Sequence, residues 1–332
     1  MLVERSRLFP DYVLLLICGF FLVCLSLPHL ISAQSFTGGS TGVTLSTNPQ
    51  FPGANYDTII SLDDYQLDTA GATITWFVDS VEQTASRNAR SITVKTGSIG
   101  RKSVVSVILS RTNAPQLTAS ITLVPTEVHI ILEAHTYVPN FYKGRALPNI
   151  GSEVRAIAIV EDGTKTIPSA YSYTWSEENT VLFGGPLKGK YAYEFTMPRY
   201  GTKQLSVDVT DGTGKSVGRG VVSLKATEPE LHFYEQSPLR GLSQKAVANP
   251  HTLIGEETTI YGEPYFISAK MNRSDALFTW KINNAITNQD TVDPNAITLQ
   301  KVGESGNSQI SLEVLTRRQI PELLKGVFNL VF

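Results

Sequence analysis

Two segments of this chain come close to motifs that do chemistry at phosphate and carbonyl groups. Gly212–Ser216 (GTGKS) is similar to the end of a phosphate-binding loop, but Val209 stands where that loop requires a glycine. Gly303–Asn307 (GESGN) is similar to the turn that carries a nucleophilic serine, which requires a glycine in place of Asn307. Both segments are therefore predicted to be turns between strands, and the Asp211-Gly212 step is typical of a tight hairpin.

Residues that bind metal ions are present, but their spacing is not that of a metal site. His129 and His135 lie six residues apart, whereas a zinc-binding helix places two histidines four residues apart. The paired acidic residues lack the alternating spacing of a calcium loop; they are Asp63-Asp64, Glu161-Asp162, Glu177-Glu178 and Glu256-Glu257. The sequence predicts no metal ion and no other cofactor. Calcium stays open as an alternative, because a site between two domains leaves no motif in the sequence.

The most unusual stretch is Tyr137–Arg145 (YVPNFYKGR), which joins three aromatic rings to two cations without strand alternation. In one interpretation the rings pack on their own domain and the cations extend along it. In the other, the stretch is an exposed patch of the composition favoured at interfaces, in contact with the following domain or with another protein. The candidate interaction residues are Tyr137, Phe141, Tyr142, Lys143 and Arg145, with Arg240 from the corresponding segment Pro238–Leu242. Tyr261–Phe266 (YGEPYF) is either the edge of a core or part of the same surface.

The elements that must position these residues are short strands. Runs rich in Val, Ile and Thr alternate with polar residues and end at Gly, Pro, Asn or Asp, as in Val104–Leu109 and Leu117–Leu123. This period of two predicts an all-β fold. Only Arg318–Lys325 is predicted to form a helical turn or two, interrupted by Pro321 and followed by a strand.

A threefold internal repeat divides the chain. The three tryptophans Trp76, Trp175 and Trp280 each follow a threonine in a strand-like run, at spacings of 99 and 105 residues. Repeats of this length indicate tandem domains, since solenoid repeats are about 20–50 residues long. Each tryptophan is predicted to fill the core of an immunoglobulin-like β-sandwich. The predicted domains are 43–125, 126–226 and 227–332.

The first 33 residues have the pattern of a secretory signal peptide. Arg5 and Arg7 precede an apolar run over Tyr12–Leu27, and a small residue, Ala33, stands at the expected cleavage site. An uncleaved membrane anchor is the alternative, because the apolar run is nearly long enough to span a bilayer. Residues 34–42 (QSFTGGSTG) are predicted to be a flexible linker.

Composition excludes several classes of protein. The chain of 332 residues carries 28 Lys and Arg against 30 Asp and Glu, and this balance argues against nucleic-acid binding, which requires a basic face. Both cysteines, Cys18 and Cys24, lie inside the predicted signal peptide. The mature chain is therefore predicted to have no disulfide and no thiol chemistry, so that its domains depend on packing alone.

The chain also resembles a known group of proteins. The hairpin of Val207–Gly214 and the Thr-Trp strands resemble bacterial surface immunoglobulin-like and PKD-like modules. More closely, residues 43–332 resemble uncharacterised exported proteins of ultra-small candidate-phylum bacteria (Patescibacteria). The matching segments are Leu45–Gly53, Thr75–Val78, Phe141–Pro148 and Glu263–Phe266. The resemblance implies a cell-envelope location and transfers no catalytic residue.

These observations predict a non-enzymatic, exported protein of the periplasm, cell surface or extracellular space. Its expected role is structural or protein-binding, with another envelope protein or a surface glycan as partner and membrane contact only through an uncleaved signal segment. The alternatives are a glycan-binding accessory module and a hydrolase with an unrecognised site. The hydrolase is the less favoured of the two, because sandwiches of about 100 residues leave little room for the deep pocket of an enzyme.

We expect the mature protein to begin at or near Gln34, because the cleavage pattern ends at Ala33. Amino-terminal sequencing of the chain purified from cell envelopes measures this directly. A chain that still begins at Met1 would instead identify the segment as an anchor.

Overall fold

The computed structural model describes residues 42–64, 71–268, 276–287, 292–316 and 321–332. Strands form almost all of the regular structure in these ranges, with two short 3-10 turns, η1 (Thr84–Ser86) and η2 (Pro168–Ala170). The all-β prediction is confirmed. The predicted signal peptide and the linker up to residue 41 lie outside the described residues. In the described part of the chain, no helix is long and apolar enough to cross a membrane.

The first pair of sheets has strand orders β1-β2-β5 and β4-β3-β6-β7, with antiparallel neighbours throughout. Its strands are β1 (Thr44–Asn48), β2 (Asp57–Asp63), β3 (Thr73–Val78), β4 (Val81–Glu82), β5 (Ser91–Lys95), β6 (Ser103–Arg111) and β7 (Ala114–Leu123). Alternate residues of both sheets point inward and form one apolar core.

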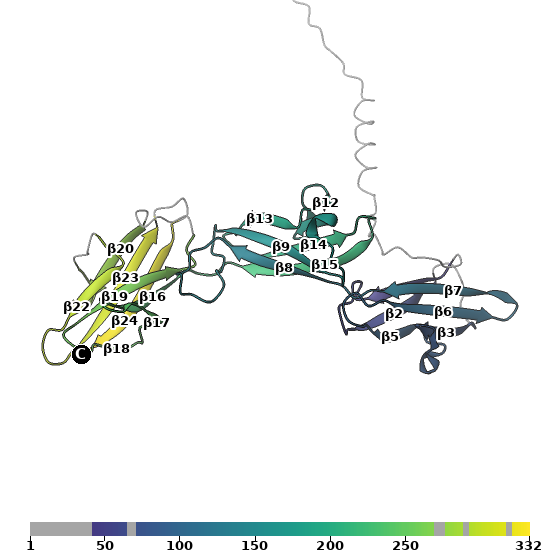
Figure 1. Ribbon diagram of the computed structural model, residues 1–332, viewed down its shortest axis with the longest axis horizontal. Helices are drawn as coiled ribbons and strands as arrows, with labels where there is room; N and C mark the ends of the chain where they lie inside the picture. Colours follow the sequence, from purple (N-terminus) through teal and green to yellow (C-terminus); the bar gives the residue numbers. More distant parts are fainter. Residues whose placement is uncertain (1–41, 65–70, 269–275, 288–291, 317–320) are drawn as a thin grey trace, which may run out of the picture. The chain divides into compact units, whose positions relative to one another are not determined.

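The second pair has orders β13-β9-β8 (Figure 1) and β11-β10-β14-β15, and β12 also pairs with β10. Its strands are β8 (Glu127–Ala134), β9 (Glu153–Glu161), β10 (Ser172–Glu177), β11 (Thr180–Val181), β12 (Leu187–Lys188), β13 (Ala192–Thr196), β14 (Thr202–Thr210) and β15 (Ser216–Lys225). The predicted hairpin at Asp211 is confirmed, because its backbone N–H donates to the Lys215 oxygen (2.9 Å) between β14 and β15.

The third pair has orders β17-β16-β19-β22 and β18-β24-β23-β20-β21. Its strands are β16 (Glu230–Ser237), β17 (Gly241–Ala246), β18 (His251–Thr252), β19 (Glu257–Tyr265), β20 (Ala276–Ile282), β21 (Ala285–Ile286), β22 (Ala296–Gln300), β23 (Asn307–Thr316) and β24 (Leu323–Val331). In all three pairs the tryptophan strand lies between a two-residue edge strand and two long strands, an order typical of immunoglobulin-like sandwiches.

The prediction of a helical turn over Arg318–Lys325 is wrong for residues 321–325, the part of this segment that the structure describes. β24 already begins at Leu323, and residues 317–320 lie outside the described ranges. Burial alternates along the whole strand, with Leu324, Phe328 and Leu330 inside, and this pairing with β23 overrides the local helical pattern.

Each sheet pair buries one tryptophan completely. Trp76, Trp175 and Trp280 have 0% of their surface exposed. They lie opposite Val107 on β6, Val207 on β14 and Leu312 on β23, respectively. Each indole Nε1 donates to a backbone oxygen farther along the chain: Ala89 (2.8 Å), Lys190 (2.8 Å) and Pro294 (3.1 Å). The same ring therefore fills the same position in each core, with its one polar atom satisfied.

The repeat extends to the turn that follows each tryptophan strand. Two residues connect it to the edge strand, and both have positive φ: Asp79-Ser80 (49° and 71°), Glu178-Asn179 (47° and 69°) and Asn283-Asn284 (49° and 69°). Two left-handed residues in succession are typical of the hairpin turn that matches strand twist. Five of the six residues are Asp, Asn or the small Ser, which tolerate this region better than bulky side chains do.

Trp175→Ala is expected to lower the free energy of unfolding by about 3–5 kcal/mol, the usual cost of removing a large buried aromatic ring. Denaturant unfolding of the purified chain measures the loss. Tyr200→Ala is the matched control, since Tyr200 is 83% exposed, and should cost no more than about 0.5 kcal/mol. A loss below about 1 kcal/mol for Trp175→Ala would contradict a core role.

Candidate functional site

The connection between β8 and β9 contains the predicted interaction segment, Tyr137–Arg145. Its start runs antiparallel to the chain that follows β19. The Tyr137 backbone N–H donates to the Ile267 oxygen (2.6 Å), and the Phe266 N–H donates to the Tyr137 oxygen (2.7 Å). Backbone hydrogen bonds therefore tie the second sheet pair to the third.

A tight turn then directs the aromatic rings of the segment. The Tyr142 N–H donates to the Pro139 oxygen (2.9 Å), so the chain reverses before Lys143. Gly144 lies under the Tyr142 ring, where a Cβ would come within 2.4 Å of the phenol oxygen. A glycine is needed here because any side chain would displace the packed ring.

The rings of this segment pack against rings of the third sheet pair. Phe141 lies edge-on to Tyr234, with centroids 5.1 Å apart, and Tyr142 lies edge-on to Tyr265 (5.4 Å) and Phe266 (6.0 Å). Such geometries add stabilisation beyond the buried area. We call this cluster the aromatic joint; it consists of the buried Tyr234, Tyr265 and Phe266, with Val138, Phe141, Tyr142 and Leu242 packed against them.

Polar groups complete the aromatic joint. The Tyr137 hydroxyl donates a hydrogen bond to the carboxylate of Glu263, a residue that is only 5% exposed. The hydroxyl oxygens of Tyr234 and Tyr265 lie 2.6 Å apart. Burial raises the pKa of Tyr265, and the hydrogen bond with Tyr234 raises it further.

A second set of contacts lies beside the aromatic joint. The Thr227 backbone N–H donates to the Pro148 oxygen (2.7 Å). The buried Asn149 side chain donates to the carboxylate of Glu322, just before β24. Both ends of the connection between β8 and β9 are therefore hydrogen-bonded to segments of the third sheet pair.

The first and second sheet pairs also meet through backbone contacts. Gly100 and Gly163 both have left-handed φ (74° and 77°), and a Cβ on Gly100 would lie 2.8 Å from the Asp162 oxygen. The Gly100 N–H donates to the Pro125 oxygen (2.9 Å). Two glycines facing each other allow an approach that side chains would prevent.

The structure separates the rings of the predicted segment from its cations. Phe141 and Tyr142 are partly buried in the aromatic joint, whereas Lys143 and Arg145 are exposed. Arg240 is also exposed, in the tight turn between β16 and β17. Pro238–Leu242 is therefore a tight turn and not an irregular segment like Tyr137–Arg145, with which the sequence analysis paired it. Its Leu242 packs against the rings of the aromatic joint.

Glu263, Tyr265 and Phe266 lie in the segment Tyr261–Phe266 that the sequence indicated, whereas Tyr234 was not singled out. The signal that indicates Tyr234 is a pair of adjacent aromatic residues in a strand, Phe233-Tyr234. Successive residues of a strand point to opposite faces, so such a pair places one ring in the core and one outside it. Because Tyr234 is nonetheless buried, another part of the chain must cover it.

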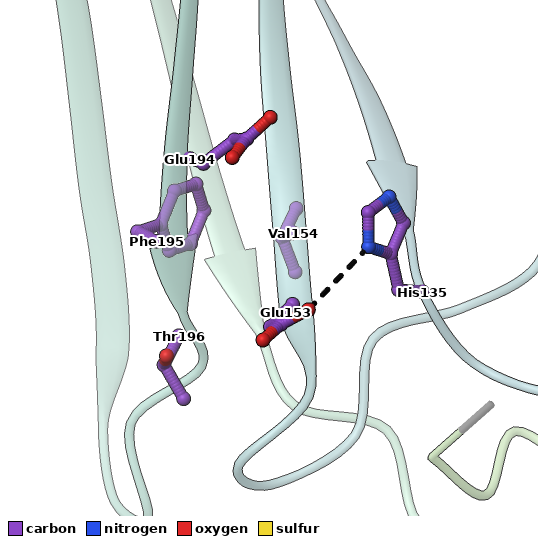
Figure 2. Close-up of a pocket in the computed structure, with 6 residues that line it drawn as sticks. All are labelled: His135, Glu153, Val154, Glu194, Phe195 and Thr196. Atoms are coloured by element: carbon purple, nitrogen blue, oxygen red, sulfur yellow. Dashed lines mark ion pairs between the residues drawn. The ribbon is translucent and has the colours of Figure 1, made fainter. Parts of the chain in front are cut away.

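A depression of about 240 Å³ lies beside the start of the same connection (Figure 2). Its lining residues are His135, Glu153, Val154, Glu194, Phe195 and Thr196. His135 Nδ1 lies 3.7 Å from a Glu153 carboxylate oxygen, and Arg155 lies 3.9 Å from both Glu133 and Glu194. These groups form a surface network of opposite charges rather than a converging pair of carboxyl groups.

No protein-family model matches the chain, and no characterised protein matches it in sequence. Among solved structures, fibronectin(III)-like modules of Clostridium thermocellum CbhA are 12% identical, with a TM-score of 0.26 over 55% of this chain and 94% of that one. The central fibronectin-III array of RIM-binding protein is 11% identical, with a TM-score of 0.30 over 88% and 98%. The Bacteroides ovatus glucan-utilization protein SGBP-B, solved with a heptasaccharide, is 13% identical, with a TM-score of 0.23 over 90% and 68%. At these TM-scores the likenesses carry no argument about activity or partner.

We expect the stability of the chain to fall as pH rises above the ordinary tyrosine value of about 10. A raised pKa in the folded state means that the folded chain keeps a proton which the unfolded chain releases. The stabilisation is therefore complete below the unfolded pKa and is lost above it. Urea unfolding between pH 8 and 11 should show a flatter decline for Tyr265→Phe than for the natural chain. Tyr200→Phe, at an exposed position, should decline as the natural chain does, and equal slopes for all three would contradict the assignment.

Proposed function

We propose that this chain is a non-enzymatic, exported cell-envelope protein of three tandem immunoglobulin-like modules, 43–125, 126–226 and 227–332. Its role in this proposal is to hold its modules in a fixed arrangement and to present a protein-binding surface. The observation that carries the proposal is the aromatic joint, in which the segment predicted to bind a partner packs its rings on the third sheet pair.

A packed connection supports a structural role for physical reasons. Domains joined by a flexible polar linker reorient freely, whereas buried rings and backbone hydrogen bonds restrict that motion. Here Tyr137 supplies both a backbone pairing with residues 266–267 and a side-chain bond to Glu263. The close approach of Gly100 and Gly163 supports a similar restriction between the first and second pairs.

The side chains beside the aromatic joint support the binding part of the proposal. Lys143 and Arg145 are exposed on the same turn that buries Phe141 and Tyr142. A packed turn holds its cations in fixed positions, so that less conformational freedom is lost when a partner binds. Arginine is also enriched at the energetic centres of protein interfaces. An acidic surface on another envelope protein is the partner that this chemistry fits.

We expect Lys143→Ala with Arg145→Ala to reduce capture of envelope proteins at least tenfold while the melting temperature is unchanged. The measurement is quantitative capture from native envelopes, with the chain from residue 34 onward as bait. The matched control is Lys165→Ala with Lys215→Ala, which removes the same charge from exposed positions of the second sheet pair.

Equal capture by both double variants would contradict a role for Lys143 and Arg145. Capture of envelope polysaccharide without protein would favour the glycan-binding alternative instead. Tyr142→Ala separates the structural part of the proposal from the binding part. It should speed amide hydrogen exchange at Phe266, whose N–H belongs to the joint, without removing either cation.

A further inference from the structure

Three side chains of types that can bind a metal ion lie together at the start of β8, outside the aromatic joint. Glu127 and His129 on β8 and Glu161 at the end of β9 each offer one ligand atom, and these atoms all lie within 4.8 Å of one another. Glu127 and Glu161 are directly opposite in the antiparallel pairing of β8 with β9. His129 is two residues along the same strand and therefore on the same face of the sheet. Folding thus joins a histidine to a carboxylate more than thirty positions away in the chain.

The arrangement of charges favours a bound cation. Two carboxylates directly opposite each other in an antiparallel pair repel and destabilise the pairing. A divalent cation between Glu127 and Glu161 would turn this repulsion into attraction. The two carboxylates would need to move little to bind such an ion, because the ligand atoms are already close together.

Glu127 is also held in a suitable orientation. One carboxylate oxygen accepts a hydrogen bond from the Ala54 backbone N–H (3.2 Å), and the other lies 3.2 Å from His129 Nε2. Two ligands at about 2.0–2.1 Å from a tetrahedral zinc ion are roughly 3.3 Å apart. The separation between Glu127 and His129 therefore already matches adjacent positions in such a site.

We propose that Glu127, His129 and Glu161 bind one divalent transition-metal ion of the zinc class. Imidazole nitrogen favours such ions over calcium and magnesium, which prefer sites made of oxygen alone. Because Glu127 also contacts Ala54, a bound ion would sit where the first sheet pair meets the second. The spacing of His129 and His135 gave no indication of this site, since its third ligand comes from the neighbouring strand.

The chain contains its own control for this proposal. In the third sheet pair, Glu230 and His232 repeat the same pattern, with His232 Nε2 2.7 Å from the Glu230 carboxylate. The residue opposite Glu230 is Tyr265 rather than a glutamate. This second pair has the same two side chains on a strand, but Tyr265 stands where Glu161 stands in the first. The carboxylate opposite His232, Glu263, accepts a hydrogen bond from the Tyr137 hydroxyl instead.

The experiment is calorimetric titration of the untagged, chelator-treated chain with ZnCl2, and in parallel with CaCl2. We expect one zinc ion per chain, with affinity reduced at least tenfold by His129→Gln or by Glu161→Gln. The matched change His232→Gln should leave the affinity within twofold. Cobalt should give the visible absorption of a site with a nitrogen ligand, and His129→Gln should change that spectrum.

Thermal unfolding separates ligation from a merely structural role. Without metal, Glu161→Gln should melt at the same temperature as the natural chain or higher, because it removes the repulsion with Glu127. With zinc, the natural chain should gain melting temperature and Glu161→Gln should not. Glu161→Gln decides the question by itself if His129→Gln does not fold. The proposal is overturned by absence of saturable zinc binding, by an equal loss in His232→Gln, or by binding of calcium in preference to zinc.

Discussion

Each sheet pair is built around the packing of one fully buried indole ring. The described chain contains no cysteine, so each sandwich is held by apolar contacts between its two sheets. Trp76, Trp175 and Trp280 fill the centre of these contacts and hydrogen-bond to a segment farther along the chain. In each sheet pair this hydrogen bond holds the residues just before β5, β13 or β22 against the sheet that carries the tryptophan. The ring thus connects the two layers by both packing and a polar contact.

Once the cores are fixed, the outer faces of the strands decide how the sheet pairs meet. A strand with aromatic residues on both faces, such as β16, leaves one ring that its own core cannot cover. The connection between β8 and β9 covers it, and this explains why Tyr137–Arg145 is aromatic but not alternating. Its cations remain exposed because burial of a charge without a partner is costly. The rings of this segment therefore pack in the aromatic joint, and its cations lie on the surface.

The aromatic joint and the cluster of Glu127, His129 and Glu161 differ in what they require from the fold. The aromatic joint depends on contacts between sheet pairs, and its hydrogen bonds and rings are distributed over several strands. The cluster of Glu127, His129 and Glu161 depends on the pairing of β8 with β9 and on the hydrogen bond between Glu127 and Ala54, and shares no residue with the aromatic joint. A change that loosens the joint should therefore leave the cluster intact, so the proposed structural role and the proposed metal site can be tested independently.

The amino-acid sequence alone predicts the all-β class, the alternation of buried and exposed residues in the strands and the places of the three tryptophans, because alternation and repeated motifs are local properties. It also predicts the hairpin at Asp211, which a short turn signal specifies. Tertiary structure decided that Leu323 begins a strand and not a helical turn, since pairing with β23 outweighs local preference. It likewise decided which rings cover Tyr234 and which carboxylate lies opposite Glu127. These last two facts depend on cross-strand register and on contacts between sheets, which bring together residues far apart in the chain and leave no spacing in the sequence that could indicate them.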